Sequence, residues 1–205
     1  MMNVILLGGG LDSTTLLAYL RADKKDLVAL NVDYGQKAVE GERKACDYFC
    51  EKYGIPMHFG SMHLGHFSNS SIMRGHIGTR EENRLELRNV ALLSYASVLC
   101  ASKGGGRIYL GLHKEEDNLY PDAHIDWLNP MRVALSLALP ESTGVDIITP
   151  FFSKSRLDIV MEAQEQDPEI LTRSYTCYES PSISGSECGV CVHCIAKKEM
   201  LGAIK

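Results

Sequence analysis

The chain has 205 residues, enough for one large domain or one domain with an appendage but not for two independent enzymatic domains. Hydrophobic residues make up 45% and charged residues 23% of the chain, values that exclude a disordered or fibrous protein. The formal net charge of −5 argues against a dominant grip on nucleic acid, because such binding requires clustered cations.

The apolar run Val4–Leu7 near the start is too short for a membrane span or for the core of a signal peptide. We therefore expect a cytoplasmic protein with no membrane partner. Seven cysteines would suggest disulfides in a secreted chain, but the number is odd and four of them lie close to the C-terminus. Metal ligation explains this distribution better.

Apolar and helical patterns alternate along the chain. The expected elements are a strand at 3–7, a helix at 13–21, a strand at 27–33, a helix at 37–53, a short strand at 57–59, a helix at 89–102, a strand at 107–110, a helix at 127–139, a strand at 146–149 and a helix at 155–166. Successive strand–helix units pair their strands in parallel through right-handed crossovers. The predicted fold class is α/β, with a doubly wound parallel sheet.

Two stretches lack a core pattern. Residues 61–86 mix polar, charged and glycine residues, which predicts a mobile surface loop able to close over a substrate. Residues 167–186 are rich in turn formers, so the chain from Cys177 onward needs something other than hydrophobic burial to hold it. We therefore expect a nucleotide-binding domain at 1–166 and a metal-binding segment at 167–205.

The loop Gly8-Gly9-Gly10-Leu11-Asp12-Ser13 lies between the first strand and the first helix. Backbone N–H groups and the helix dipole offer an anion positive potential there, and glycines let the backbone approach a phosphate closely. The loop is neither a GxxxxGK(S/T) P-loop nor a GxGxxG motif. A tight turn without a ligand is the alternative for any such glycine-rich loop.

This loop resembles the SGGxDS signature of the PP-loop ATP pyrophosphatases, which split ATP between its α and β phosphates and transfer AMP to a substrate oxygen. The resemblance implies an adenine nucleotide alpha hydrolase-like fold in which the loop and Mg²⁺ hold the departing pyrophosphate, with Asp12 and Ser13 catalytic. Gly8 replaces the first Ser of the signature, which removes a donor worth about 1–3 kcal/mol. The expected nucleotide-binding residues are Leu7, Gly8, Gly9, Gly10, Leu11, Asp12, Ser13 and Thr14.

Four cysteines near the C-terminus follow the spacing Cys-x10-Cys-x2-Cys-x2-Cys: Cys177, Cys188, Cys191 and Cys194. Four thiolates at such spacing close a tetrahedral Zn²⁺ site, which would hold a tail with little core of its own and a helix at 192–203. Unrelated buried cysteines and an iron–sulfur cluster are the alternatives. His193 is expected at the surface, and Cys46, Cys50 and Cys100 are expected to be core or helix-surface thiols.

The loop and the cysteine tail together resemble the QueC family of queuosine biosynthesis over nearly the whole chain. Further pieces match in order: Asp33-Tyr34-Gly35-Gln36, Arg88-Asn89, Glu116-Asp117, Tyr120-Pro121-Asp122, Pro150 with Ser153-Lys154, and Cys177-Tyr178. Two departures are Ala123 and His124, where the family usually has Cys and Arg, and Lys197 or Lys198, where it usually has Arg.

The resemblance implies an ATP-dependent C–N ligase with ATP, Mg²⁺ and Zn²⁺ as cofactors. In the family, the carboxylate of 7-carboxy-7-deazaguanine attacks the α-phosphate of ATP and forms an acyl adenylate and pyrophosphate. Ammonia then displaces AMP to form an amide, and a second adenylation, on the amide oxygen, leads to the nitrile 7-cyano-7-deazaguanine. Relatives of this kind also imply a homodimer.

The leaving pyrophosphate needs cations around it, and we expect Lys154 and Arg88 to be catalytic, with Lys37 as a further candidate. A guanine-like ring offers N–H donors to a carboxylate and a face for stacking. Ordinary solvated charges and polar loops are the alternatives for all these positions. The expected substrate-binding residues are Asp117, Tyr120, Asp122 and Tyr178.

Three other functions are weighed against the synthase. Some QueC-like proteins belong to antiphage-defence operons, and resemblance to those implies conjugation of the activated deazaguanine to a protein amine. The change at Gly8 also suits a non-catalytic zinc module that binds nucleotide or RNA without turnover. A tRNA-thiolating PP-loop enzyme is a weaker alternative, since such enzymes generally need a larger RNA-binding surface than this acidic chain offers.

Overall fold

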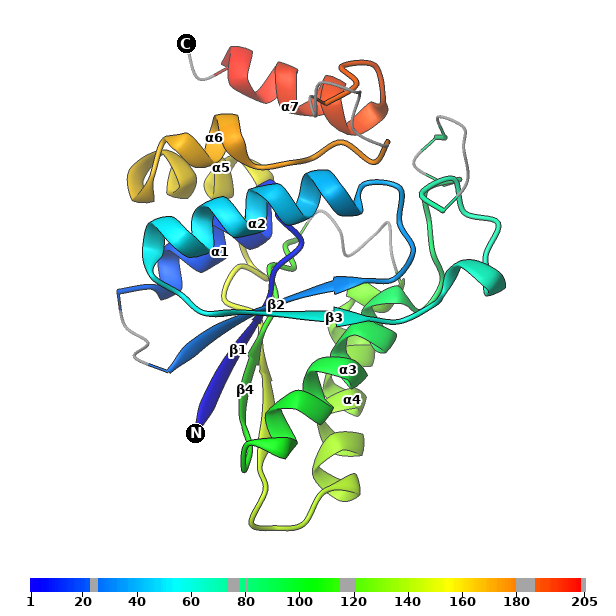
Figure 1. Cartoon of the computed structure of the whole chain (residues 1–205), viewed down its shortest axis with the longest axis vertical. Helices are drawn as coiled ribbons and strands as arrows, with labels where there is room; N and C mark the ends of the chain where they lie inside the picture. Colours follow the sequence, from blue (N-terminus) through cyan, green and yellow to red (C-terminus); the bar gives the residue numbers. More distant parts are fainter. Residues whose placement is uncertain (23–25, 74–77, 80, 115–120, 180–186, 204–205) are drawn as a thin grey trace.

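The protein is built around one sheet of five parallel strands in the order β3-β2-β1-β4-β5 (Figure 1). The structure, a computed structural model, describes the chain except residues 23–25, 74–77, 80, 115–120, 180–186 and 204–205. The strands are β1 (Met2–Leu6), β2 (Leu27–Asp33), β3 (Met57–Ser61), β4 (Gly106–Tyr109) and β5 (Val145–Ile148). The strand order runs outward in both directions from β1, so the predicted doubly wound parallel sheet is confirmed.

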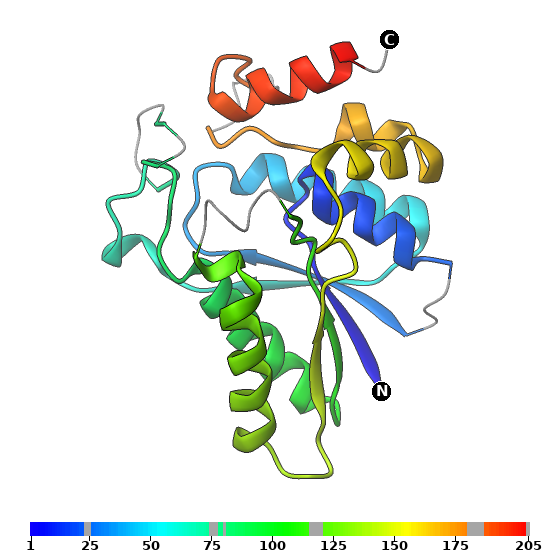
Figure 2. The ribbon, with the colours of Figure 1, turned by 180° about the vertical axis from the view of Figure 1, so that it is seen from behind.

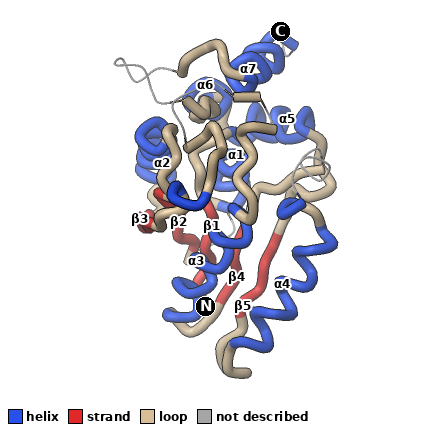
Figure 3. Tube along the Cα trace, turned by 90° about the vertical axis from the view of Figure 1, so that its right-hand side faces the viewer, coloured by secondary structure: helices blue, strands red, loops and turns tan. Residues whose placement is uncertain are grey.

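Helices cover both faces of this sheet (Figures 1 and 2). One face carries α1 (Leu11–Leu20), α2 (Val39–Tyr53), α5 (Arg156–Gln166) and the short α6 (Glu169–Arg173), and the other carries α3 (Arg88–Ser102) and α4 (Ile125–Ala138). A last helix, α7 (Val192–Ala203), lies beyond α5 and α6 and farther from the strands (Figure 3).

Alternate residues of β1 belong to two different cores. Val4 packs in the cluster that includes Leu93 of α3 and Leu128 of α4, whereas Ile5 packs in the cluster that includes Phe49 of α2. Successive side chains of a strand point to opposite faces, so an apolar run without alternation is needed where helices cover both faces. This requirement explains the continuous apolar pattern at the start of the chain.

Two expectations from the sequence need correction, one about the start of the first helix and one about burial after residue 167. The first helix begins at Leu11 rather than Ser13, because the N–H of Thr14 donates to the carbonyl of Gly10 and starts the helical ladder inside the glycine loop. The stretch from residue 167 has a core after all, since α6 buries Ile170 and Leu171. The division into units at 1–166 and 167–205 stays a prediction.

The segment 61–86 packs against the body of the protein in its described part. The N–H of Ser71 donates to the carbonyl of Glu82, and the N–H of Lys37 donates to the carbonyl of Ile72. Ile72 is buried, so this segment supplies a fixed apolar side chain as well as surface. In the described residues no helix is both long and apolar enough to cross a membrane.

Candidate active site

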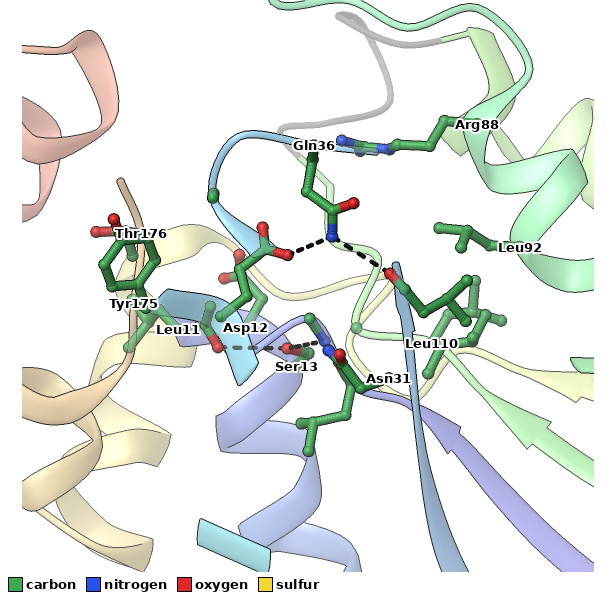
Figure 4. Close-up of a pocket in the computed structure, with 18 of the residues that line it drawn as sticks. Leu11, Asp12, Ser13, Asn31, Gln36, Arg88, Leu92, Leu110, Tyr175 and Thr176 are labelled. Carbon is green, nitrogen blue, oxygen red and sulfur yellow. Dashed lines mark hydrogen bonds between the residues drawn. The ribbon is translucent and has the colours of Figure 1, made fainter. Parts of the chain in front are cut away.

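A cavity of about 270 Å³ lies at the carboxyl ends of β1, β2 and β4. The strand order reverses between β1 and β4, and open parallel sheets bind ligands in the crevice at such a reversal. Figure 4 shows Arg88 on one side of this cavity and Tyr175 on the other, with Ser13 between them. Its wall includes Gly8, Asp12, Ser13, Asn31, Gln36, Glu42, Arg88, Arg156, Tyr178 and His193.

The glycine loop forms the floor of the cavity at the start of α1. Six of its eight expected nucleotide-binding residues line the wall: Leu7, Gly8, Gly10, Leu11, Asp12 and Ser13. Ser13 braces the loop, because its Oγ accepts from the N–H of Gly8 at 3.2 Å and donates to the carbonyl of Gly10 at 3.3 Å. Gly10 is the N-cap and provides no side-chain acceptor, so the first N–H groups of α1 are available to an anion.

The other two expected residues of the loop, Gly9 and Thr14, lie behind this wall. Gly9 has φ +72°, and a Cβ there would lie 2.5 Å from the carbonyl oxygen of Glu42. Thr14 is fully buried. These two residues therefore shape the loop from behind, and glycine is required at position 9 by both backbone conformation and space.

Two buried oxygen atoms at the cavity, Asp12 Oδ1 and Asn31 Oδ1, have no hydrogen-bond partner within the described part of the chain. Asn31 Nδ2 donates to the carbonyl of Leu7 at 2.8 Å, which fixes the orientation of its amide. A buried acceptor without a donor is unfavourable, so both atoms suit a ligand that brings N–H or O–H groups or a cation. The Asp12 carboxylate, next to the anion-binding loop, is a fitting ligand for Mg²⁺.

Gln36 and Glu42 form the wall between β2 and α2. Gln36 Nε2 donates to the Glu42 carboxylate at 2.8 Å and to the carbonyl of Val32 at 3.3 Å (Figure 4). Gln36 Oε1 accepts from the N–H of Tyr34 at 2.9 Å. Burial raises the pKa of Glu42 to about 7, although the hydrogen bond from Gln36 and the charge of Arg88 oppose this rise. Arg88 also hydrogen-bonds the hydroxyl of Tyr34, whose pKa is raised by burial.

The basic residues around the cavity differ from the set that the sequence suggested. Arg88 lines the wall as expected. Lys154 is not a wall residue, and its Nζ lies 2.6 Å from the Glu162 carboxylate. Arg156, the first residue of α5, does line the wall, with its Nη2 3.3 Å from Nε2 of buried His113.

The sequence reasoning missed Arg156 because it follows Lys154 by two residues, and the pattern does not tell which of the two faces the strands. Lys37, the further candidate, is not a wall residue either, and its Nζ forms an ion pair of 2.5 Å with Glu179. Among the described residues, the cavity wall therefore contains two arginines, one from each face of the sheet.

Of the residues expected to bind a substrate, Tyr178 lines the cavity. Its ring lies over the ring of His193, with a centroid distance of 3.8 Å and an angle of 30°. His193 was expected at the surface, but it lies in the cavity wall with Tyr178. No feature of the cysteine spacing indicates which way the residue between two ligands points, so this aromatic pair was not foreseen.

Asp122 is not a wall residue, and it caps α3 instead. Its carboxylate accepts from the N–H of Asn89 at 2.8 Å, and the Asn89 side chain donates to its carbonyl at 3.1 Å. This contact fixes the start of α3, where Arg88 stands. The expected contacts Asp117 and Tyr120 lie outside the described residues.

The four cysteines of the tail form one cluster, in which their Sγ atoms all lie within 4.8 Å of one another. Tetrahedral Zn²⁺ with Zn–S bonds of about 2.3 Å requires S–S separations of roughly 3.8 Å, and the Cys188 and Cys194 sulfurs are 3.9 Å apart. The N–H groups of Cys188 and Glu179 donate to Cys177 Sγ. Such bonds stabilise thiolates and orient metal ligands, so the cluster fits Zn²⁺.

The other three cysteines are buried away from this cluster, as expected: Cys46, Cys50 and Cys100. Burial raises the pKa of the Cys50 thiol to about 12 and also raises the pKa of the Cys100 thiol. Both are therefore neutral core groups near pH 7.

The segment that leads into the cysteine cluster crosses the glycine loop. The N–H of Tyr175 donates to the carbonyl of Gly9 at 2.8 Å. Buried Lys197 of α7 donates to the carbonyl of Ser174 at 2.6 Å and forms an ion pair of 3.0 Å with Glu187. The tail is thus connected directly to the floor of the cavity and supplies one of its walls.

Comparison with known proteins matches the family model described as queuosine biosynthesis protein QueC over residues 2–205. The 7-cyano-7-deazaguanine synthase of Leptospira interrogans serogroup Icterohaemorrhagiae serovar copenhageni is 30% identical over 209 residues, which cover 96% of this chain and 84% of that relative. The 7-cyano-7-deazaguanine synthase of Campylobacter concisus is 26% identical over 201 residues, which cover 93% of this chain and 89% of the relative.

Among solved structures, a 4-thiouridine synthetase–RNA complex with bound ATP is similar with a TM-score of 0.53 and 16% identity. The similarity covers 98% of this chain and 50% of the other chain. At this level of identity the similarity shows a shared fold.

Proposed function

This chain belongs to the QueC family of queuosine biosynthesis, and from that premise we propose that it is an ATP-dependent 7-cyano-7-deazaguanine synthase. The observation that carries this proposal is the glycine loop at the start of α1, which lines one cavity together with Asp12, Arg88 and Tyr178. A single cavity then contains an anion-binding loop, a carboxylate, a cation and an aromatic ring. These are the groups that adenylation of a cyclic carboxylic acid requires.

In the first step, a carboxylate oxygen of 7-carboxy-7-deazaguanine attacks the α-phosphorus of ATP, and the bond from that phosphorus to the bridging oxygen breaks. Pyrophosphate leaves towards the N–H groups of the glycine loop, where Ser13 braces the backbone. The guanidinium of Arg156, in the same cavity wall, stabilises the growing charge. Mg²⁺ held by Asp12 would neutralise part of that charge.

The carboxylate substrate occupies the end of the cavity near Tyr178 and Arg88. Tyr178 offers its ring to one face of the heterocycle, and Arg88 offers its guanidinium to the carboxylate. Asp122 supports this arrangement from outside the wall, because it fixes Asn89 and hence the first turn of α3. Direct contacts of Asp117 and Tyr120 with the heterocycle remain part of the proposal, whereas Asp122 and Lys154 act from outside the cavity wall.

In the second step, ammonia attacks the acyl carbon, the carbon–oxygen bond to AMP breaks, and one proton leaves the nitrogen. A second ATP then adenylates the amide oxygen. Loss of AMP together with the two amide protons forms the nitrile. Both activations use an oxygen on the same carbon, so one phosphate loop serves them both.

Zn²⁺ bound by the cysteine cluster would close the tail around four thiolates. In our proposal its role is to hold the segment between Ser174 and Tyr178 as a wall of the cavity. We further propose that the protein acts as a homodimer in the cytoplasm. The QueC family's chemistry makes ammonia the first choice of acceptor for the activated carbonyl, and a protein amine is the alternative that the experiment must separate.

The test is to incubate the protein with ATP, Mg²⁺, 7-carboxy-7-deazaguanine and ammonium chloride. We expect AMP and pyrophosphate, with the free nitrile identified by mass spectrometry, and we expect Asp12→Ala to abolish all three products. Formation of ADP would contradict the reaction. A deazaguanine adduct on a protein would identify conjugation instead, and binding without AMP formation would identify a non-catalytic module.

A further inference from the structure

Glu42 is an acidic side chain of the cavity wall that the adenylation step does not use. It lies in the first turns of α2, and its Oε2 accepts a hydrogen bond of 2.8 Å from Gln36 Nε2. Among the described residues, Arg88 is the cation whose charge acts on Glu42. The half-buried Glu42 carboxylate lines the same cavity as the glycine loop, and an ionised carboxylate in such a place is stabilised by a cation next to it.

The groups that face Glu42 shift its pKa in both directions. Asp33 at the end of β2 raises its pKa, and Arg88 across the cavity lowers it. Tyr34 and Cys46 also face Glu42, and its negative charge contributes to the raised pKa of each of them. Burial is the largest effect, and it raises the pKa of Glu42 to about 7. The carboxyl group therefore exchanges a proton with its surroundings near neutral pH.

The position of Glu42 also relates it to the reacting phosphate. Its carbonyl oxygen is 2.5 Å from the point where Gly9 would carry a Cβ, so the backbone of α2 lies directly behind the glycine loop. Its side chain and the loop residues Gly8 and Asp12 line the same cavity. A small cation held by Glu42 is therefore in the cavity where the acyl adenylate forms.

We propose that Glu42 binds the ammonium ion in this cavity and accepts a proton from it, which makes Glu42 a catalytic residue of amide formation. This inference rests on the proposed synthase function. One N–H bond of ammonium breaks, the proton moves to the Glu42 carboxylate, and the electron pair stays on nitrogen. Nitrogen then bonds to the acyl carbon, AMP leaves with the electrons of its carbon–oxygen bond, and a second nitrogen proton passes to water.

Ammonium matches this site in charge, size and chemistry. Its positive charge is opposite to that of the ionised Glu42 carboxylate, and it is the smallest of the reactants. It also carries the proton that must be removed before nitrogen has an electron pair to donate. A general base is most effective when its pKa lies close to the working pH, and burial moves the pKa of Glu42 towards that range.

The experiment separates the two half-reactions in Glu42→Gln, which keeps the shape of the side chain and an oxygen able to accept from Gln36. Pyrophosphate release without ammonium measures the first adenylation, and amide formation from ammonium chloride measures the second step between pH 6 and 10. The matched control is Glu40→Gln, an exposed glutamate on the same helix.

We expect Glu42→Gln to release pyrophosphate within about twofold of the wild type and to form amide at least about tenfold more slowly at pH 7. At alkaline pH, where free ammonia is abundant, the two rates should converge. Glu42→Asp, which keeps a carboxylate, should retain part of the rate at pH 7. Glu40→Gln should behave as the wild type throughout.

An equal amide rate in Glu42→Gln at pH 7 overturns this inference and leaves the synthase function intact. Loss of pyrophosphate release in that variant assigns Glu42 to ATP or Mg²⁺ and also overturns the inference. Absence of pyrophosphate from the wild type overturns the proposed function, and the role of Glu42 with it.

Discussion

The N–H of Tyr175 donates a hydrogen bond of 2.8 Å to the carbonyl oxygen of Gly9. This bond joins the segment from Ser174 to Tyr178, which we call the strap, to the glycine loop that precedes α1. Two residues far apart in sequence thereby fix each other's position, and the geometry of the glycine loop depends on the fold of the tail.

Substitution of Gly9 tests how closely the loop is specified. We expect Gly9→Ala to lower the free energy of unfolding by about 1–2 kcal/mol from the left-handed backbone alone, and by more because the new Cβ would overlap the Glu42 carbonyl. Nucleotide affinity should fall with it. Thermal unfolding and calorimetric titration with ATP measure the two effects.

Gly8→Ala is the matched control, since a Cβ at Gly8 meets no atom within 4 Å and its backbone is not left-handed. It should change the free energy of unfolding by less than about 0.5 kcal/mol. Equal losses in Gly8→Ala and Gly9→Ala would show that the loop is not held in the described conformation.

The metal prediction concerns the cysteine cluster and its effect on the strap. The wild type should contain about one zinc ion per chain, and Cys188→Ala should lose it. Loss of metal should also speed amide hydrogen exchange at Tyr175 and Thr176, because their segment depends on the folded tail. Cys100→Ala, in a buried cysteine outside the cluster, should keep its zinc. Iron with visible absorbance would contradict the assignment.

Arg156 and Lys154 make different predictions for catalysis. Arg156 lines the cavity, whereas the ammonium of Lys154 pairs with Glu162 outside the wall. We expect Arg156→Ala to slow pyrophosphate release by about 10²-fold, as loss of a group that stabilises transition-state charge does. Lys154→Ala should slow it by less than about threefold, and the opposite order would show that Lys154 is the cation at the triphosphate.

Glu42 also predicts how stability depends on pH. Its pKa is about 7 in the folded protein and near 4.3 in the unfolded chain, so the folded state holds the proton more tightly. The free energy of unfolding should therefore fall as pH rises from about 4 to about 7, by about 3–4 kcal/mol from this residue. Glutamine does not titrate, so the free energy of unfolding of Glu42→Gln should not show this decrease.

The measurement is the melting temperature of Glu42→Gln and wild type at pH 5 and pH 8. The variant should gain on the wild type at pH 8 relative to pH 5, and Glu40→Gln should show no such gain. A constant difference between the two pH values would mean that Glu42 titrates normally in the folded protein.

Much of the fold was predictable because its signals are local. The apolar run of β1, the glycines after it and the pattern of α1 are each contained in a few residues. Element ends were less predictable, as the early start of α1 shows. The short helix α6 was missed because five residues span too few turns for a periodic pattern, although Ile170 and Leu171 are buried.

The site was predictable where one residue type in one spacing meets a fixed chemical need, as in the cysteine cluster. It was not predictable where two basic residues lie close together in sequence and only one of them lines the cavity. Lys154 and Arg156 illustrate this, since which of them enters the wall depends on where α5 begins. Gln36 belonged to a matching motif, but its contact with Glu42 arises only when β2 and α2 are brought together.

The position of the strap in the sequence has a consequence during synthesis. All strands of the described sheet leave the ribosome before Tyr175 does, so the sheet can form while the cavity still lacks one wall. On the proposed zinc site, the wall of the cavity is complete only after the four cysteines have emerged and bound the metal. On that proposal, zinc starvation should yield a protein with an intact sheet and an open cavity.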